Sequence, residues 1–218
     1  MRNQNTPLAF EGIPFLAAAG VTSLVLILLV GRFPLLAVPA ALALLATVFV
    51  AFFFRNPQRV TPADERSVVA PADGVVIYCG PGKEEYLGAE MLKISIFMSV
   101  FNVHINRVPV TGLVTDTFYR PGKFLDVRDE RATFENERLG LVLEASGGAR
   151  LVVVQVAGLI ARRIVCYARK GDSLLRGRRY GLIRFGSRLD VYLPLSTELK
   201  VALGDKTVAG ETVLGILA

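Results

Sequence analysis

The chain has 218 residues, 52% of them hydrophobic, and carries a formal net charge of +6 at pH 7. This length leaves about one domain of ordinary size once the apolar N-terminal part is set aside, enough to bury a core. One histidine and two isolated cysteines exclude a metal centre built from several histidines and suggest neither a disulfide framework nor a zinc site. We therefore expect no metal cofactor.

The N-terminal part contains two long apolar segments. No charged residue occurs in residues 13–31 or 33–54, and each run is long enough, as a helix, to cross a hydrocarbon layer about 30 Å thick. The connector 31–34 is too short for a translocated domain, so we expect a membrane hairpin within residues 1–54. A secretory signal peptide, the alternative, predicts one short apolar core. A shallow hairpin lying in one leaflet is a further alternative.

The charges flanking the hairpin predict its orientation. Arg2 precedes the first segment and Arg55 and Arg59 follow the second, against Arg32 alone in the connector. Because positive residues favour the cytoplasmic side of a membrane, we expect a cell-membrane protein whose remaining chain lies on the cytoplasmic side.

The remainder of the chain is β-rich. Residues 55–62 have the proline and polar content of a linker, and residues 63–218 form the predicted domain. Short β-branched runs separated by Gly, Pro and Asp turns indicate strands, at 68–69, 75–78, 92–97, 141–143, 151–156 and 164–167. The charged segment 126–138 is a loop or a short surface helix. Segments 70–76 and 199–216 resemble lipoyl- and biotinyl-type barrel sandwiches. The predicted fold is a membrane helical hairpin followed by a β-dominated domain, α+β at most.

Positive charge is concentrated in one stretch. Between Arg162 and Arg188 there are nine Lys or Arg residues and only Asp172 against them. No recognition helix or aromatic RNA-binding motif accompanies this stretch, so we expect no nucleic-acid partner. Anionic membrane lipids are the simpler partner beside a membrane anchor, and an ordinary solvated basic face is the alternative.

The pair Gly186-Ser187 is the candidate reactive centre. Most Gly-Ser pairs are plain turns. In a strained turn, however, the serine hydroxyl can attack the glycine carbonyl, and the resulting ester can eliminate and hydrolyse to leave a pyruvoyl group. Glycine favours this chemistry because, without a Cβ, it permits both a strained backbone and a close approach.

The sequence around this pair resembles phosphatidylserine decarboxylase proenzymes of the short bacterial type. The matching segments are residues 55–57, 71–74, 97–107, 155–164 and 181–194. The resemblance implies a zymogen that cuts itself between Gly186 and Ser187. The two fragments, 1–186 and 187–218, would remain together as a heterodimer. The sequence leaves the oligomeric state open, a homo-oligomer included.

The resemblance also implies the reaction. The enzyme would be a lyase of phospholipid biosynthesis that converts phosphatidylserine to phosphatidylethanolamine. Its cofactor would be a covalent pyruvoyl group derived from Ser187, which would form a Schiff base with the substrate amine and accept the electron pair released as carbon dioxide leaves.

His104 and Asp73 are the other candidate catalytic residues. A lone histidine among apolar residues is usually a hydrogen-bonded structural one. The resemblance implies instead that His104 is the general acid and base and that Asp73 supports self-processing, in a set like Ser/His/Asp. Longer family members have a second histidine where this chain has Arg107. It therefore stays open whether His104 serves processing, decarboxylation or both.

Four arginines are candidate ligands of the lipid phosphate, because guanidinium groups match phosphate bidentately. They are Arg162, Arg163, Arg184 and Arg188. A firm salt bridge to the substrate carboxylate is disfavoured, since it would stabilise the ground state against loss of carbon dioxide. Ordinary surface charge is the alternative for each.

A non-catalytic, membrane-anchored barrel-sandwich adaptor or carrier domain is the alternative function. A carrier needs a lysine for lipoyl or biotinyl attachment at a hairpin tip. The natural candidate, Lys206, lies in a Gly-Asp-Lys turn without the usual flanking residues. An adaptor would remain one uncut chain, whereas the enzyme would consist of two fragments.

Overall fold

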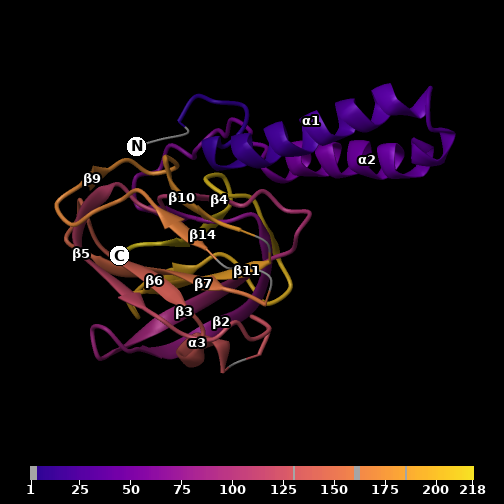
Figure 1. The fold of residues 1–218 in the computed structure, drawn as a ribbon. Helices are drawn as coiled ribbons and strands as arrows, with labels where there is room; N and C mark the ends of the chain where they lie inside the picture. The colour runs from indigo at the N-terminus through magenta and orange to yellow at the C-terminus, as the bar shows by residue number, and fades with distance from the viewer. Residues whose placement is uncertain (1–3, 130, 160–162, 185) are drawn as a thin grey trace. The chain divides into compact units, whose positions relative to one another are not determined.

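The structure, a computed structural model, describes residues 4–129, 131–159, 163–184 and 186–218. The chain divides into two compact units, Asn5–Gln58 and Arg59–Ala218, with Gln4 belonging to the second. Figure 1 shows that the first unit is helical and the second is built from strands. The division falls after Gln58, inside the segment 55–62 expected to be a linker.

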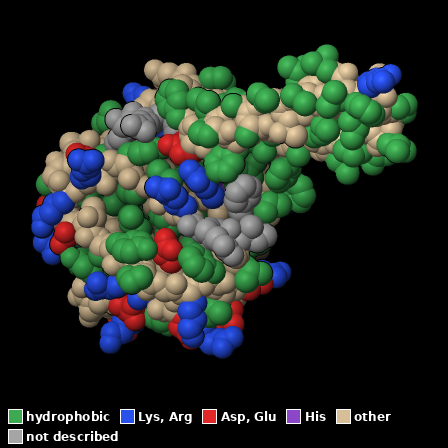
Figure 2. Space-filling model, viewed as in Figure 1, with side chains coloured by type: hydrophobic (Ala, Val, Ile, Leu, Met, Phe, Trp, Pro, Cys, Tyr) green, Lys and Arg blue, Asp and Glu red, His purple; other side chains and the backbone are tan. Residues whose placement is uncertain are grey.

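The first unit is a helical hairpin. Its helices are α1 (Ile13–Val30) and α2 (Ala37–Phe53), preceded by the 3-10 turns η1 (Phe10–Gly12) and η2 (Pro34–Leu36). The spans Phe10–Val30 and Pro34–Phe53 each have a mean hydropathy of 2.5 and are long and apolar enough to cross a membrane. Hydrophobic side chains cover most of this unit's surface in Figure 2. The predicted hairpin is confirmed, and its apolar surface indicates membrane association.

A polar contact joins the two helices of this apolar unit. The Oγ of Ser23 lies 2.8 Å from the Oγ1 of Thr47. Each hydroxyl also lies within hydrogen-bonding distance of the carbonyl oxygen four residues earlier, on Ala19 and Ala43. Hydroxyls paired in this way satisfy one another where a membrane interior would offer them no water.

The second unit contains three antiparallel sheets (Figure 1). The large sheet curls into a half-barrel of eight strands, in the order β13 (Lys206–Thr207), β2 (Gly74–Glu84), β3 (Ala89–Met98), β11 (Ser187–Leu193), β7 (Arg150–Ala157), β6 (Arg138–Ala145), β5 (Gly112–Arg120) and β9 (Ser173–Leu174). One small sheet has the order β1 (Ser67–Val69), β14 (Val213–Ile216), β12 (Glu198–Leu199). The other has the order β4 (Ile105–Arg107), β10 (Arg179–Ile183), β8 (Ile164–Cys166).

The two faces of the large sheet differ in what they pack against. Along β11, Leu189 and Val191 belong to the main hydrophobic core, and we call their side the inner face. Tyr192 belongs to a second, smaller cluster with Val152 and Val154, on the side that we call the outer face. Because successive side chains of a strand point to opposite faces, Ser187 lies on the inner face and Arg188 on the outer one.

The β-dominated domain predicted from the sequence is confirmed. The runs 75–78, 92–97 and 151–156 lie within β2, β3 and β7. The charged segment 126–138 contains the short helix α3 (Ala132–Glu135) and the first residue of β6. The strands form where β-branched residues give a pleated surface that can be buried on both faces.

Candidate active site

The pair Gly186-Ser187 lies where the chain enters β11. Gly186 has a φ of +64°, in the left-handed region that glycine adopts without steric penalty. Ser187 is 0% exposed. It pairs with Met98 at the end of β3 on one side and with Ala157 at the end of β7 on the other. Strands on both sides therefore fix the position of Ser187.

The carbonyl group of Gly186 lies against Gly158, just after β7. A Cβ built on Gly158 would be 2.3 Å from the Gly186 oxygen and 3.1 Å from its carbonyl carbon. Side chains do not approach a backbone oxygen so closely, so this arrangement requires glycine at position 158. Gly158 lies in the segment 155–164, which resembles the family, but its residue type alone did not indicate a role. A glycine directly after an apolar strand is the sequence feature that could have indicated a close backbone approach here.

Buried amide side chains lie beside Ser187 on the inner face. Ser187 Oγ is 3.5 Å from Met98 Sδ, and Asn106 Nδ2 is 3.8 Å from the same sulfur. Gln155 Nε2 donates a 2.7 Å hydrogen bond to Asn106 Oδ1. Gln155 Oε1 is buried and accepts no hydrogen bond from any described residue. An unsatisfied buried acceptor is unusual in proteins, and here it marks a polar position on the same face of the sheet as Ser187, opposite Leu189.

His104 is buried two residues before Asn106, at the start of the small sheet that contains β4. It immediately precedes β4, and the pairing of Ile105 with Leu182 in β10 fixes it in register. The side chain is 2% exposed, and its Nδ1 lies 3.0 Å from the carbonyl oxygen of Asn102. A carbonyl can only accept a hydrogen bond, so in the neutral ring Nδ1 carries the proton and Nε2 the lone pair.

Asp73 lies at the same end of the large sheet, but its carboxylate is hydrogen-bonded to residues other than His104 and Ser187. It precedes β2, one strand beyond β3, so its backbone is roughly 10 Å from Ser187 at the usual strand spacing. Its Oδ2 accepts a 2.8 Å hydrogen bond from Arg59 Nη2, and its Oδ1 accepts another from the backbone N–H of Ala209. Neither contact is with His104 or Ser187.

Arg107 stands three residues after His104, where the resemblance implies a second histidine in longer family members. Its Nη1 donates a 2.8 Å hydrogen bond to the carbonyl oxygen of Gly177. Burial, together with repulsion from Arg179 and Arg59, lowers the pKa of Arg107 to about 10. The guanidinium therefore remains charged near neutral pH and is a poor substitute for a histidine in proton transfer.

The three candidate arginines that the structure describes do not converge on one point. The backbone N–H of Arg184 donates to the carbonyl oxygen of Arg163, which brings these two residues together. Arg188, by contrast, is 3% exposed on the outer face and is hydrogen-bonded to Asp190, Thr133 and the Val127 carbonyl. Arg162 lies outside the described residues.

Comparison with known proteins identifies the family. Residues 46–215 match the family model described as phosphatidylserine decarboxylase. The phosphatidylserine decarboxylase proenzymes of Geobacter sulfurreducens and Geotalea uraniireducens are each 70% identical over 217 residues, which is 100% of this chain and of theirs. That of Trichlorobacter lovleyi is 56% identical over 218 residues, 98% of each chain. On this match, the chain belongs to the phosphatidylserine decarboxylase family.

Proposed function

We propose that this chain is a self-processing decarboxylase that cuts itself between Gly186 and Ser187 and converts phosphatidylserine to phosphatidylethanolamine. Family membership supports the reaction. The observation that carries the self-cleavage is the placement of the Gly186 carbonyl against Gly158, with Gly186 at φ +64°. Such a carbonyl is held in one position beside a buried serine hydroxyl, as an intramolecular attack requires.

The cleavage proceeds through the residues of this turn. Ser187 Oγ bonds to the Gly186 carbonyl carbon, and the C–N bond between the two residues breaks to give an ester. Loss of the Ser187 α-proton then breaks the Cβ–O bond and releases the Gly186 carboxylate. Tautomerisation, addition of water and loss of ammonia leave a pyruvoyl group at the start of the small fragment.

His104 is the proposed proton acceptor for Ser187. The hydrogen bond from Nδ1 to the Asn102 carbonyl leaves Nε2 as the basic nitrogen of the neutral ring. Asp73 is proposed to act through charge: it balances Arg59 at the end of the sheet where Ser187 lies. In this role Asp73 is a positioning residue rather than one that touches the reacting atoms.

The surroundings of Ser187 fit a pyruvoyl group. Gly158 leaves room beside the neighbouring carbonyl, and Asn106 and Gln155 provide amide groups on the same face. When formed, the group supplies a ketone that accepts the electron pair released as carbon dioxide leaves. The buried inner face limits the access of bulk water to this position, since Ser187, Asn106 and Gln155 are each 0% exposed. Electrostatic interactions are stronger in such an environment.

The rest of the chain brings the lipid to this site. The hairpin holds the enzyme at the membrane, and the charges of Arg2, Arg55 and Arg59 support a cytoplasmic catalytic domain. Arg163 and Arg184, which lie together near the cleavage point, are the better-placed candidates for the lipid phosphate. Fragments 1–186 and 187–218 stay associated because β11 pairs along its length with β3 and β7 (Figure 1).

The mass of the purified protein tests this proposal. We expect two fragments on a denaturing gel and by mass spectrometry, with the smaller running from position 187 to Ala218 and blocked to N-terminal sequencing. The same preparation should release carbon dioxide from vesicles containing phosphatidylserine. An intact chain without activity would favour the adaptor alternative, and an intact chain with full activity would rule out the pyruvoyl mechanism.

Substitution of Gly158 tests the placement of the carbonyl. The Gly158→Ala side chain would collide with the Gly186 oxygen and displace the carbonyl from Ser187, so we expect cleavage to slow by about 100-fold. The measurement is the rate at which the two fragments appear after synthesis. Gly147→Ala is the matched control, because a Cβ there meets nothing within 4 Å. Cleavage of Gly158→Ala at the rate of the control would contradict this role.

A further inference from the structure

Two buried amide side chains connect the small sheet of β4 to the inner face of the large sheet. Asn106 belongs to β4 and Gln155 to β7, and both are 0% exposed. Gln155 Nε2 donates a 2.7 Å hydrogen bond to Asn106 Oδ1 and a longer one, of 3.4 Å, to the carbonyl oxygen of Val165 in β8. The tip of the Gln155 side chain is therefore held by two strands of the small sheet.

Glycine at position 181 makes room for this contact. Gly181 pairs with Asn106 in β4 and with Cys166 in β8. A Cβ built on Gly181 would lie 3.2 Å from Gln155 Nε2 and 2.2 Å from the carbonyl oxygen of Val165, so a larger residue would separate the strands from the amide. The amide is buried even though Gln155 Oε1 accepts no hydrogen bond from any described residue, which costs stability. Such a cost points to a function of the amide pair.

The amide pair directs an N–H group of Asn106 toward the cleavage site. Because Asn106 Oδ1 accepts the hydrogen bond from Gln155, the amide is held in one orientation, with Nδ2 on its other side. Nδ2 lies 3.8 Å from Met98 Sδ, and Ser187 Oγ lies 3.5 Å from the same sulfur. This thioether is the acceptor for Nδ2 within the part of the chain that the structure describes, and a thioether accepts only weakly. Asn106 therefore keeps donor capacity next to the sulfur that Ser187 Oγ also contacts.

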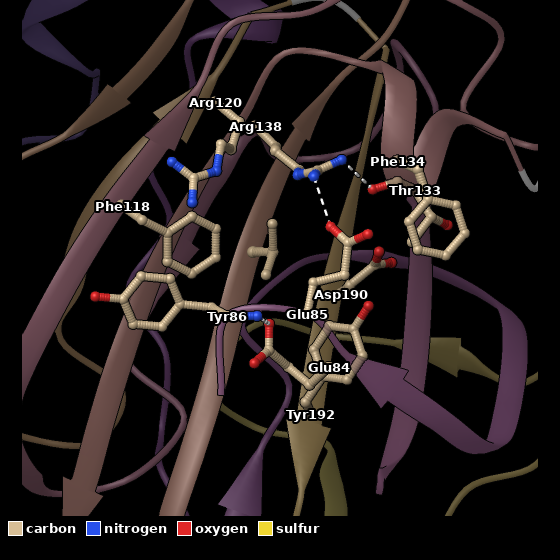
Figure 3. A pocket seen from close by; sticks show the side chains of 11 residues that line it. Glu84, Glu85, Tyr86, Phe118, Arg120, Thr133, Phe134, Arg138, Asp190 and Tyr192 are labelled. Carbon is tan, nitrogen blue, oxygen red and sulfur yellow. Dashed lines mark hydrogen bonds and ion pairs between the residues drawn. The ribbon is translucent and has the colours of Figure 1, made fainter. Parts of the chain in front are cut away.

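The charged side chains of β11 lie on the outer face and cannot take this role. Arg188 directly follows Ser187, but its Nη2 donates a 2.9 Å hydrogen bond to Asp190 Oδ2. Figure 3 shows Asp190 in an outer-face pocket, together with the ion pair between Glu85 and Arg138. Because the sheet separates the two faces, negative charge that develops at Ser187 has to be stabilised by a group of the inner face.

The elimination step of the proposed cleavage places negative charge on the oxygen that was Ser187 Oγ. In the ester this oxygen joins the Gly186 carbonyl carbon to the Cβ of residue 187. When a base removes the α-proton, a double bond forms between Cα and Cβ. The Cβ–O bond breaks, and its electron pair stays on the oxygen, which leaves as part of the Gly186 carboxylate. A donor at this oxygen would stabilise the transition state more than the ester.

We infer that Asn106 is a catalytic residue of self-cleavage, whose Nδ2 donates a hydrogen bond to the departing carboxylate oxygen. Gln155 is the positioning residue that holds the Asn106 amide in the required orientation. This inference rests on the proposed self-cleavage and assigns the donor for one of its steps. Asn106 stands two residues after His104, so the proposed base and the proposed donor come from one short segment.

Trapping the ester tests this inference on the full-length chain. Asn106→Leu removes the donor with little change in volume, and we expect the ester to form but its elimination to slow about 100-fold. Hydroxylamine, which cleaves esters, should then release a small fragment from the folded variant. That fragment should begin with a free serine that N-terminal sequencing can read, and it should be heavier than the pyruvoyl fragment by one ammonia. The parent chain should yield the blocked fragment without hydroxylamine, and Ser187→Ala should remain whole in its presence.

Two further variants separate the donor from its packing. Gln155→Met keeps the length of the side chain but cannot orient Asn106, so it should also accumulate the ester, to a smaller extent. Thr197→Val is the matched control, because the Thr197 hydroxyl is likewise buried without a hydrogen-bond partner among the described residues. We expect Thr197→Val to cut itself at the parental rate. Thermal unfolding shows whether each variant is folded.

The outcomes distinguish this inference from the proposed function. Asn106→Leu that cuts itself as fast as Thr197→Val would overturn the inference. A folded Asn106→Leu that stays whole in hydroxylamine would also overturn it, because the donor would then serve the attack and not the elimination. If Asn106→Leu does not fold, Gln155→Met decides by the same two criteria. An uncut parent chain would instead refute the self-cleavage itself.

Discussion

Replacement of Ser187 by alanine is expected to leave the chain uncut and without decarboxylase activity. Alanine has no hydroxyl to attack the Gly186 carbonyl, so neither the ester nor the ketone derived from it can form. The fold should persist, because the change removes one oxygen from a strand that keeps all its pairings with β3 and β7. The measurements are a denaturing gel, carbon dioxide release from phosphatidylserine vesicles and thermal unfolding.

Ser173→Ala is the matched control for this experiment. Ser173 is also the first residue of a strand, β9, but it is exposed. We expect this variant to cut itself and to decarboxylate like the parent chain. If Ser187→Ala still yields two fragments, or remains whole yet active, the serine is not the source of the catalytic group.

The fold was predictable from sequence because its signals are local. Uninterrupted apolar runs predict a hairpin whatever the rest of the chain does, and β-branched runs between turn residues predict strands. The order of the strands is not local. One neighbour of β3 in the sheet, namely β11, begins almost 90 residues after β3 ends. No periodic pattern of hydrophobic residues identifies a neighbouring strand that is so distant in the sequence.

The candidate site also has some features that depend on local sequence and others that depend on the order of the strands. Gly186-Ser187 and His104 are predictions that rest on short segments resembling the family, so they needed no knowledge of the fold. The contact between Gly158 and the Gly186 carbonyl, and the amide pair Asn106-Gln155, depend on which strands are neighbours and in which register. Arg188 is a different case. Strand alternation alone predicts that the residue after Ser187 faces the opposite side, once Ser187 is known to begin a strand.

Replacement of His104 by alanine should slow self-cleavage by a factor of about 10² to 10⁴, the usual contribution of a positioned acid or base. The side chain is 2% exposed and fixed through Nδ1 by the Asn102 carbonyl, so it has one defined nitrogen to offer as a base. The rate of fragment formation measures the effect on processing. Carbon dioxide release, divided by the amount of cut chain, measures the effect on decarboxylation separately.

A purely structural histidine would respond differently, and two further measurements distinguish it. Added imidazole should partly restore cleavage in His104→Ala if the missing group is a base, whereas it cannot repair lost packing. His104→Gln retains a side-chain N–H donor for the Asn102 carbonyl and should keep the thermal stability of the parent chain while losing cleavage. A His104→Ala protein that cuts and decarboxylates at parental rates would remove His104 from both steps. Because Arg107 stays cationic near neutral pH, another group would then have to carry the proton.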